Sequence, residues 1–278
     1  MNSRERAWLA RLAWVGVAAL SAGCESVNTT QGGVVGIERQ QRMSSLVSEQ
    51  QLRQGAVQAY QEELGKAQSK GNLNADTVLT ERVRAVSRRI IPVTSAFRPD
   101  APGWAWEVNV IRSDQVNAWC MPGGKIAFYT GLIQKLSLND DEIAAVMGHE
   151  VAHALREHAR ERASEQIGAQ LGISVVAAAL GGGQMTADLL GGFYNVGFNL
   201  PHSRLHETEA DRIGVELAAR AGYDPHAAVG LWTKMAQAGS GKGPEFLSTH
   251  PSDATRLRDL EAYAVRVQPL YEQARRGR

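Results

Sequence analysis

Two histidines and a glutamate stand within five residues of the chain, in the run HEVAH from His149 to His153. On an α-helix, residues four apart lie on one face, so the imidazoles of His149 and His153 can converge on a single cation. Glu150 is turned to one side of that face, where its carboxylate can act on water as a general base. These residue types at this spacing are typical of a hydrolytic zinc site.

The residues before this run predict the helix that carries it. Asn139 can cap a helix start with Glu142 three residues later, and Asp140 and Asp141 suit the positive end of the helix dipole. An apolar face follows at helical spacing, formed by Ile143, Val146, Met147 and Leu155. His158 lies off this face in a basic stretch, and we expect it at the surface.

A catalytic zinc needs a third protein ligand, and a second predicted helix after residue 203 offers one. Glu207 and Asp211 are four residues apart on one face, so Glu207 is the predicted ligand and Asp211 is expected to hydrogen-bond a ligand histidine. His206 is the competing ligand, and His202 is a weaker one. Small residues on both helices favour a close crossing: Gly148, Ala152, Gly214 and Ala218. Two further glutamates are expected to face solvent: Glu209 and Glu216.

The remaining patterns predict an α+β fold, mostly helical with a small β-sheet. Residues 38–70 and 76–92 have helical spacing of apolar positions, and residues 104–111 alternate as a strand does. Two short strands are predicted on either side of the turn sequence Pro122-Gly123-Gly124.

Composition limits the classes of function. The 278 residues are 44% hydrophobic and 21% charged, with a formal net charge of +1. This composition suits a globular domain with a sizeable core and gives no broad basic field for nucleic acid. The two cysteines do not predict a disulfide framework, and Cys120 is expected to be a buried free thiol.

Residues 1–23 have the organisation of a signal peptide: a basic start, then an apolar run too short for the roughly 20 residues that span a bilayer. The end of the run, LSAGC at 20–24, resembles a bacterial lipobox, which implies cleavage before Cys24 and lipid on that cysteine. An ordinary secretory signal and a short uncleaved anchor are the alternatives. Glu25, where inner-membrane lipoproteins carry aspartate, favours the outer membrane. Residues 24–37 are predicted to be a flexible tether, and residues 38–278 the folded domain.

HEVAH followed by ETEAD resembles the HExxH…ExxxD signature of the HtpX-like gluzincin zinc metallopeptidases. That family includes CAAX prenyl endopeptidases, mitochondrial Oma proteases and periplasmic enzymes of the BepA and LoiP kind. The likeness covers about residues 38–263 and implies a zincin-like peptidase domain with one Zn²⁺ per chain. No tetratricopeptide array follows, so the LoiP kind is the nearer likeness and partner docking is not expected.

The resemblance implies a metalloendopeptidase of the bacterial cell envelope that hydrolyses misfolded or damaged envelope proteins. In similar members a histidine matching His250 can occupy the open zinc position, which makes His250 a candidate gate. Arg256 is a candidate anchor or oxyanion stabiliser. Substrate is expected to add to an edge strand formed by Asn117, Ala118, Trp119 and Cys120.

The sequence also leaves rival readings open. The gated site suits a zinc-stabilised chaperone or scaffold lipoprotein without activity, and a structural lipoprotein without metal is a weaker reading. The Gly-rich apolar segment 171–201 is expected either to cover the cleft or to touch the membrane, and a cover is favoured because its glycines can act as hinges.

Overall fold

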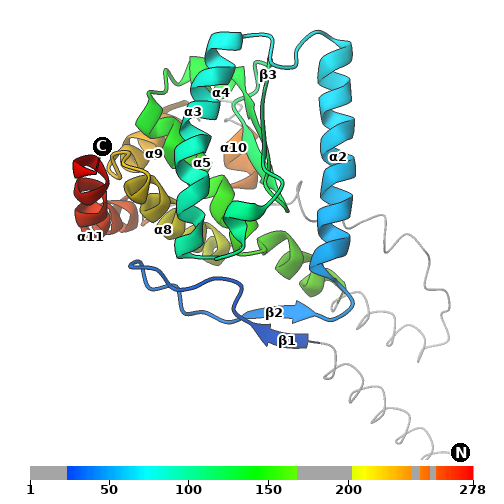
Figure 1. The fold of residues 1–278 in the computed structure, drawn as a ribbon, viewed down its shortest axis with the longest axis vertical. Coiled ribbons are helices and arrows are strands. Elements are labelled where there is room, and N and C mark those ends of the chain that lie inside the picture. The colour runs from blue at the N-terminus through cyan, green and yellow to red at the C-terminus, as the bar shows by residue number, and fades with distance from the viewer. Residues whose placement is uncertain (1–23, 168–201, 239–244, 251–254, 278) are drawn as a thin grey trace, which may run out of the picture.

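The computed structural model describes residues 24–167, 202–238, 245–250 and 255–277 (Figure 1). The predicted signal peptide and the predicted cover at 171–201 lie outside these residues. The helices are α2 (Glu49–Ser69), α3 (Thr77–Val93), α4 (Thr130–Lys135), α5 (Asp140–Leu155), α8 (Arg204–Arg220), α9 (Ala227–Ala238), α10 (Glu245–Thr249) and α11 (Arg256–Arg276). The strands are β1 (Cys24–Val27), β2 (Gln41–Ser44), β3 (Glu107–Ile111), β4 (Ala118–Met121) and β5 (Lys125–Tyr129). Within the described part of the chain, none of the helices combines the length and apolar character needed to cross a bilayer.

The larger sheet has the strand order β3-β5-β4. The central strand β5 runs parallel to β3 and antiparallel to β4, and Ala118 of β4 lies opposite Phe128 of β5. Gly123 and Gly124 make the turn between β4 and β5, each with a φ of 84°, a conformation that glycine adopts at little cost. The predicted strand pair around this turn is confirmed, and β4 has β5 as its one strand neighbour among the described residues.

Helices pack on this sheet and on one another to form the main core. α3 lies against β3, α5 lies against β4, α8 and α9 pack on α5, and α11 packs on α8 and α9 (Figure 1). Buried apolar side chains from all of these elements form one continuous cluster. The predicted α+β class, mostly helical with a small sheet, is confirmed.

The crossing of α5 and α8 is close because two glycines meet there. A Cβ atom added to Gly148 would lie 2.6 Å from the carbonyl oxygen of Gly214, and one added to Gly214 would lie 2.7 Å from the backbone nitrogen of His149. Only residues without a Cβ allow the two backbones to approach this closely. The crossing therefore brings the HExxH turn of α5 against the first turns of α8.

The N-terminal segment differs from the prediction. Residues 24–37 are not a tether outside the domain, because β1 pairs with β2 and the side chains of Val35 and Ile37 belong to the main core. The long helix expected over 38–70 starts only at Glu49, where Ser48 caps it and forms a capping box with Gln51. The residues before it form β2 instead. Figure 1 shows β1 and β2 together at one end of the molecule.

Candidate metal centre

The helix that carries the HExxH run starts as predicted. The Asn139 side chain accepts a hydrogen bond from the backbone N–H of Glu142, and the Glu142 side chain accepts one from the backbone N–H of Asn139. α5 then runs to Leu155, with His149, Glu150 and His153 all buried in its later turns. α8 supplies Glu207 from its first turn, and Ser203 caps that helix by accepting from the backbone N–H of His206.

Four side chains converge between these helices: His149, His153, Glu207 and His250, each at most 6% exposed. The Nε2 atoms of His149 and His153 are 3.1 Å apart. Glu207 approaches them with Oε2 at 3.6 Å from His149 Nε2 and Oε1 at 3.4 Å from His153 Nε2. His250 Nδ1 lies 2.9 Å from Glu207 Oε1 and 3.2 Å from His149 Nε2.

This donor set fits a zinc ion. Two imidazole nitrogens and a carboxylate are ligands of hydrolytic zinc sites. The Nδ1 atom of His149 lies 2.9 Å from the Asp211 carboxylate, which can only accept, so this nitrogen carries the proton and the Nε2 lone pair points into the cluster. Ring nitrogens this close together, with lone pairs turned toward one another, favour a cation between them. His149, His153 and Glu207 are therefore candidate ligands, and His250 stands where a fourth ligand would bind.

Asp211 and Arg256 stabilise the positions of His149 and Glu207. The Arg256 guanidinium donates to both oxygens of Asp211 at 2.7 Å, and its Nη2 lies 3.0 Å from Glu207 Oε2. The guanidinium also lies over the Trp232 ring. Arg256 is thus placed to anchor the carboxylates of Asp211 and Glu207. An anchor is one of the two roles expected for it.

The electrostatics of the cluster separate the two glutamates. Burial opposes ionisation of Glu207, but the charge of His250 and its hydrogen bond outweigh it and hold the pKa of Glu207 well below its usual value. Burial raises the pKa of Glu150. Burial also lowers the pKa of His153 well below its usual value. An ionised Glu207 and a neutral His153 are the forms that bind metal, whereas a carboxyl with a raised pKa suits proton transfer.

Glu150 stands beside the cluster rather than within it. Its Oε1 atom is buried and accepts no hydrogen bond, and His250 Nε2 lies 3.5 Å away. Burial works against protonation of His250, but the charges of Glu207 and Glu150 outweigh it and raise the pKa of His250. A buried carboxylate oxygen with no donor, turned toward a cleft, is placed to accept a proton from water.

The cleft that reaches the cluster runs beside β4. The residues that line a cavity of about 350 Å³ include Glu150, His153 and His250, together with Asn117, Trp119 and Cys120. The predicted substrate strand and the candidate metal ligands thus line one cavity. Cys120 is a buried free cysteine, as expected, and burial raises its pKa well above the usual value.

The two alternative third ligands, His202 and His206, are not part of the four-residue cluster. The His202 ring packs 4.0 Å from the ring of His153 and stacks on His250, and His202 is not a member of the four-residue cluster. His206 belongs to a second buried group with His158 and Glu161, whose ligand-type atoms lie within 4.8 Å of one another. Of the candidates for third ligand, the structure brings Glu207 to the histidine pair.

The surface position predicted for His158 is wrong, since its side chain is completely buried. The prediction treated residue 158 as part of a continuous helix. α5 instead ends at Leu155, Glu157 has a φ of 51°, and helical structure resumes at His158. That change of direction turns His158 back toward the cluster, with its Nδ1 atom 2.9 Å from His153 Nδ1.

The solvent positions predicted for Glu209 and Glu216 are also wrong, because both side chains are buried. Arg39 donates to both oxygens of Glu209, at 2.7 and 2.9 Å, and the backbone N–H of Val35 donates to Glu216 at 2.9 Å. The N-terminal segment, predicted to be a tether, is what covers this side of α8.

A helix-borne HExxH run, with a glutamate from a second helix completing the donor set, defines the metallopeptidase class of site. The model of Peptidase family M48 matches residues 78–264, so the chain belongs to that family, and the resemblance inferred from its motifs is confirmed. The chain is 36% identical over 189 residues to mitochondrial metalloendopeptidase OMA1 of Schizosaccharomyces pombe, covering 67% of this chain and 53% of the relative. It is 27% identical over 211 residues to the beta-barrel assembly-enhancing protease of Escherichia coli K12, covering 72% and 42%. The chain thus spans about half of the length of each of these two relatives.

Proposed function

We propose that the chain is a zinc metalloendopeptidase of the bacterial cell envelope that hydrolyses unfolded or damaged proteins. The observation that carries this proposal is the convergence of His149, His153 and Glu207, with Glu150 beside them on a cleft. Membership of family M48 and relatives named metalloendopeptidase and protease support the class of reaction.

His149, His153 and Glu207 would hold the zinc ion. When bound, zinc supplies a Lewis acid that polarises the scissile carbonyl and makes water more acidic. Glu150 takes the proton of the attacking water and passes it to the leaving amine. Asp211 fixes His149 through the Nδ1 hydrogen bond, and Arg256 fixes Asp211.

Substrate would lie along β4 as an added strand. β4 is an edge strand among the described residues and lines the same cavity as Glu150. Main-chain hydrogen bonds to an edge strand recognise extended backbone with little regard for side chains, which suits an enzyme for unfolded proteins.

The test of catalysis replaces Glu150 by Gln, which keeps the size of the side chain and removes the base. Cleavage of an unfolded substrate such as casein is expected to fall by roughly 10²–10⁴-fold while the zinc content stays at one per chain. Glu165→Gln, which alters an exposed glutamate on the helical residues after His158, serves as the control and is expected to cleave normally. Retained cleavage by Glu150→Gln would remove this residue from the mechanism.

The envelope location rests on the sequence of the leader. Lipid on Cys24 would anchor the domain, and outer-membrane attachment follows from Glu25. Cys24→Ser is expected to move the protein from the membrane fraction of cells to the soluble fraction and to abolish labelling by a fatty-acid analogue. Unchanged labelling would show that Cys24 is not the lipid site.

A second candidate function is a latched scaffold or chaperone without peptidase activity. The observation that favours it is His250, whose Nδ1 lies 2.9 Å from Glu207 in the position of a fourth ligand. If His250 acts as a gate, His250→Ala should cleave casein faster than the wild type does. If neither protein cleaves any unfolded substrate but both bind it, the scaffold function replaces the peptidase.

A further inference from the structure

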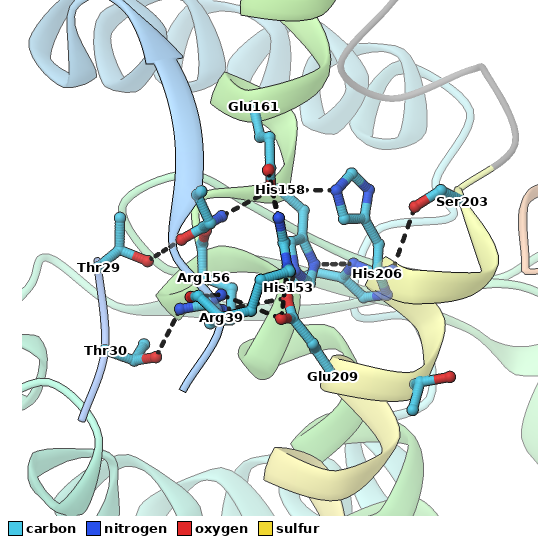
Figure 2. Close-up of polar contacts among 12 residues, drawn as sticks. Thr29, Thr30, Arg39, His153, Arg156, His158, Glu161, Ser203, His206 and Glu209 are labelled. Carbon is cyan, nitrogen blue, oxygen red and sulfur yellow. Dashed lines mark hydrogen bonds and ion pairs between the residues drawn. The ribbon is translucent and has the colours of Figure 1, made fainter. Parts of the chain in front are cut away.

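The two candidate histidine ligands are supported in different ways. His149 donates from Nδ1 directly to the Asp211 carboxylate, at 2.9 Å. His153 instead meets a third imidazole, because its Nδ1 atom lies 2.9 Å from Nδ1 of His158. The other nitrogen of His158, Nε2, lies 3.0 Å from Glu209 Oε2. Figure 2 shows the contacts of His158 with His153 and with Glu209, which extends from α8.

The direction of each hydrogen bond follows from the carboxylate. A carboxylate can only accept, so His158 carries its proton on Nε2 and donates it to Glu209. Two arginines, Arg39 and Arg156, already balance the charges of Glu209 and Glu161 in this buried network, which favours an uncharged His158 ring. The Nδ1 atom of a neutral ring with a proton on Nε2 is an acceptor. His153 must therefore donate from Nδ1, and its own Nε2 is left with a lone pair facing the cluster.

We propose that His158 and Glu209 are positioning residues that fix the tautomer and orientation of His153 for zinc binding, as Asp211 does for His149. The inference rests on the proposal that His149, His153 and Glu207 hold zinc. Carboxylates that accept from ligand histidines raise ligand basicity and hold the ring in place. Here the carboxylate acts on His153 through an intervening imidazole.

The support reaches beyond the two catalytic helices. Glu209 is held by Arg156, at the end of α5, and by Arg39, which also donates to both oxygens of Glu161 at 2.6 and 2.8 Å (Figure 2). Arg39 belongs to the N-terminal segment just before β2. The position of His153 thus depends on that segment being folded against α8.

A second metal ion at His158, Glu161 and His206 is the competing interpretation, and the geometry disfavours it. The rings of His158 and His206 are stacked with centroids 4.3 Å apart and planes 20° apart, so their lone pairs run side by side rather than converge. Both oxygens of Glu161 already accept hydrogen bonds, from Arg39 and, at Oε2, also from Gln41 and His206. Positive guanidinium groups beside the group add repulsion for a cation.

Two substitutions of His158 separate positioning from packing. The amide of an asparagine overlays Nδ1 of a histidine ring, so His158→Asn keeps an acceptor for His153 and loses the link to Glu209. The amide of a glutamine overlays Nε2, so His158→Gln keeps the link to Glu209 and loses the acceptor. Both remove the ring, and circular dichroism of the full-length proteins checks that each one folds.

The affinity for Zn²⁺, measured by chelator competition, is the deciding quantity. His158→Gln is expected to weaken it by roughly 10–100-fold, whereas His158→Asn, which keeps the acceptor for His153 and loses only the support of Glu209, is expected to weaken it by less than about tenfold. The visible spectrum of the Co²⁺-substituted protein is expected to change in His158→Gln and to remain close to wild type in His158→Asn. Equal losses in the two variants, or none in either, would overturn the positioning role.

His206→Asn is the matched control, since His206 is buried in the same network and hydrogen-bonds Glu161 rather than His153. It is expected to leave zinc affinity unchanged. A wild-type protein that binds two zinc ions, one of them lost in His206→Asn, would overturn the inference in favour of a second metal site. A wild-type protein that binds no zinc would overturn the proposed function itself, and the inference with it.

Discussion

Two neighbouring groups of buried histidines and glutamate, built around the same helices, differ in what surrounds their polar atoms. In the candidate metal centre, the Nε2 atoms of His149 and His153 face each other at 3.1 Å. In the second group, Glu161 is paired with Arg39 and its partners His206 and His158 are stacked. The residue types alone do not distinguish a metal site from a buried ion network. The arrangement does: ring nitrogens face each other in the first group, whereas in the second the rings are stacked and both oxygens of Glu161 accept from Arg39.

The largest expected contrast comes from removing one glutamate of each group. Zinc in structural protein sites is bound by about 10–16 kcal/mol in total, so loss of one of the three ligands in Glu207→Ala is expected to weaken zinc binding by roughly 1,000-fold. Glu161→Ala, an equally buried change, should leave zinc affinity within a few-fold of wild type. Zinc titration of both variants measures this difference, and similar losses would make the two groups parts of one site.

The ion network makes its own prediction about stability. Arg39→Ala leaves Glu161 and Glu209 as buried carboxylates without their shared partner, and breaking such pairs costs about 3 kcal/mol or more. The free energy of unfolding of the zinc-free protein in urea measures the loss. Arg42→Ala, an exposed arginine of β2, is the control and should change that free energy by less than about 0.5 kcal/mol. An equal effect in both variants would mean that the network adds nothing to stability.

The sequence predicted the parts of the molecule whose signals are local. The cap at Asn139, the HExxH spacing and the turn at Pro122-Gly123-Gly124 each lie within a few residues, and the structure has a helix or strand pair at each. The burial of His158 depends on a left-handed residue at Glu157, which nothing in its residue type predicts. The burial of Glu209 depends on Arg39, 170 residues earlier in the chain. Contacts between residues so far apart leave no periodic pattern in the sequence. For this reason the sequence predicted both a tether at residues 24–37 and solvent positions for Glu209 and Glu216, and both predictions were wrong.

The close crossing of α5 and α8 is expected to determine the geometry of the metal centre. In Gly214→Ala the new methyl group would meet the backbone of His149 at 2.7 Å, so α5 and α8 must move apart. Overpacking of this kind costs about 1–3 kcal/mol of stability, and zinc affinity should fall with it because Glu207 moves away from the histidines. Gly65→Ala, in α2 with nothing within 4 Å of the new methyl group, should instead stabilise the protein slightly. Calorimetry and zinc titration of the two variants test whether the glycines set the site.

The smallest expected effect is the pH dependence of the ion network. Burial opposes ionisation of Glu161, but hydrogen bonds from Arg39, His206 and Gln41 outweigh it and hold the pKa of Glu161 well below its usual value. A carboxyl whose pKa is lower in the folded state than in the unfolded state stabilises the fold above about pH 4.3, and this contribution is lost as the pH falls below that value. Between pH 6 and pH 3, zinc-free wild type should therefore lose on the order of 1–2 kcal/mol more stability than Glu161→Gln, which cannot titrate at this position. Glu62→Gln, an exposed change in α2, should keep the wild-type slope. If the free energy of unfolding falls equally with pH in wild type and in Glu161→Gln, the pKa of Glu161 is not lowered in the folded state.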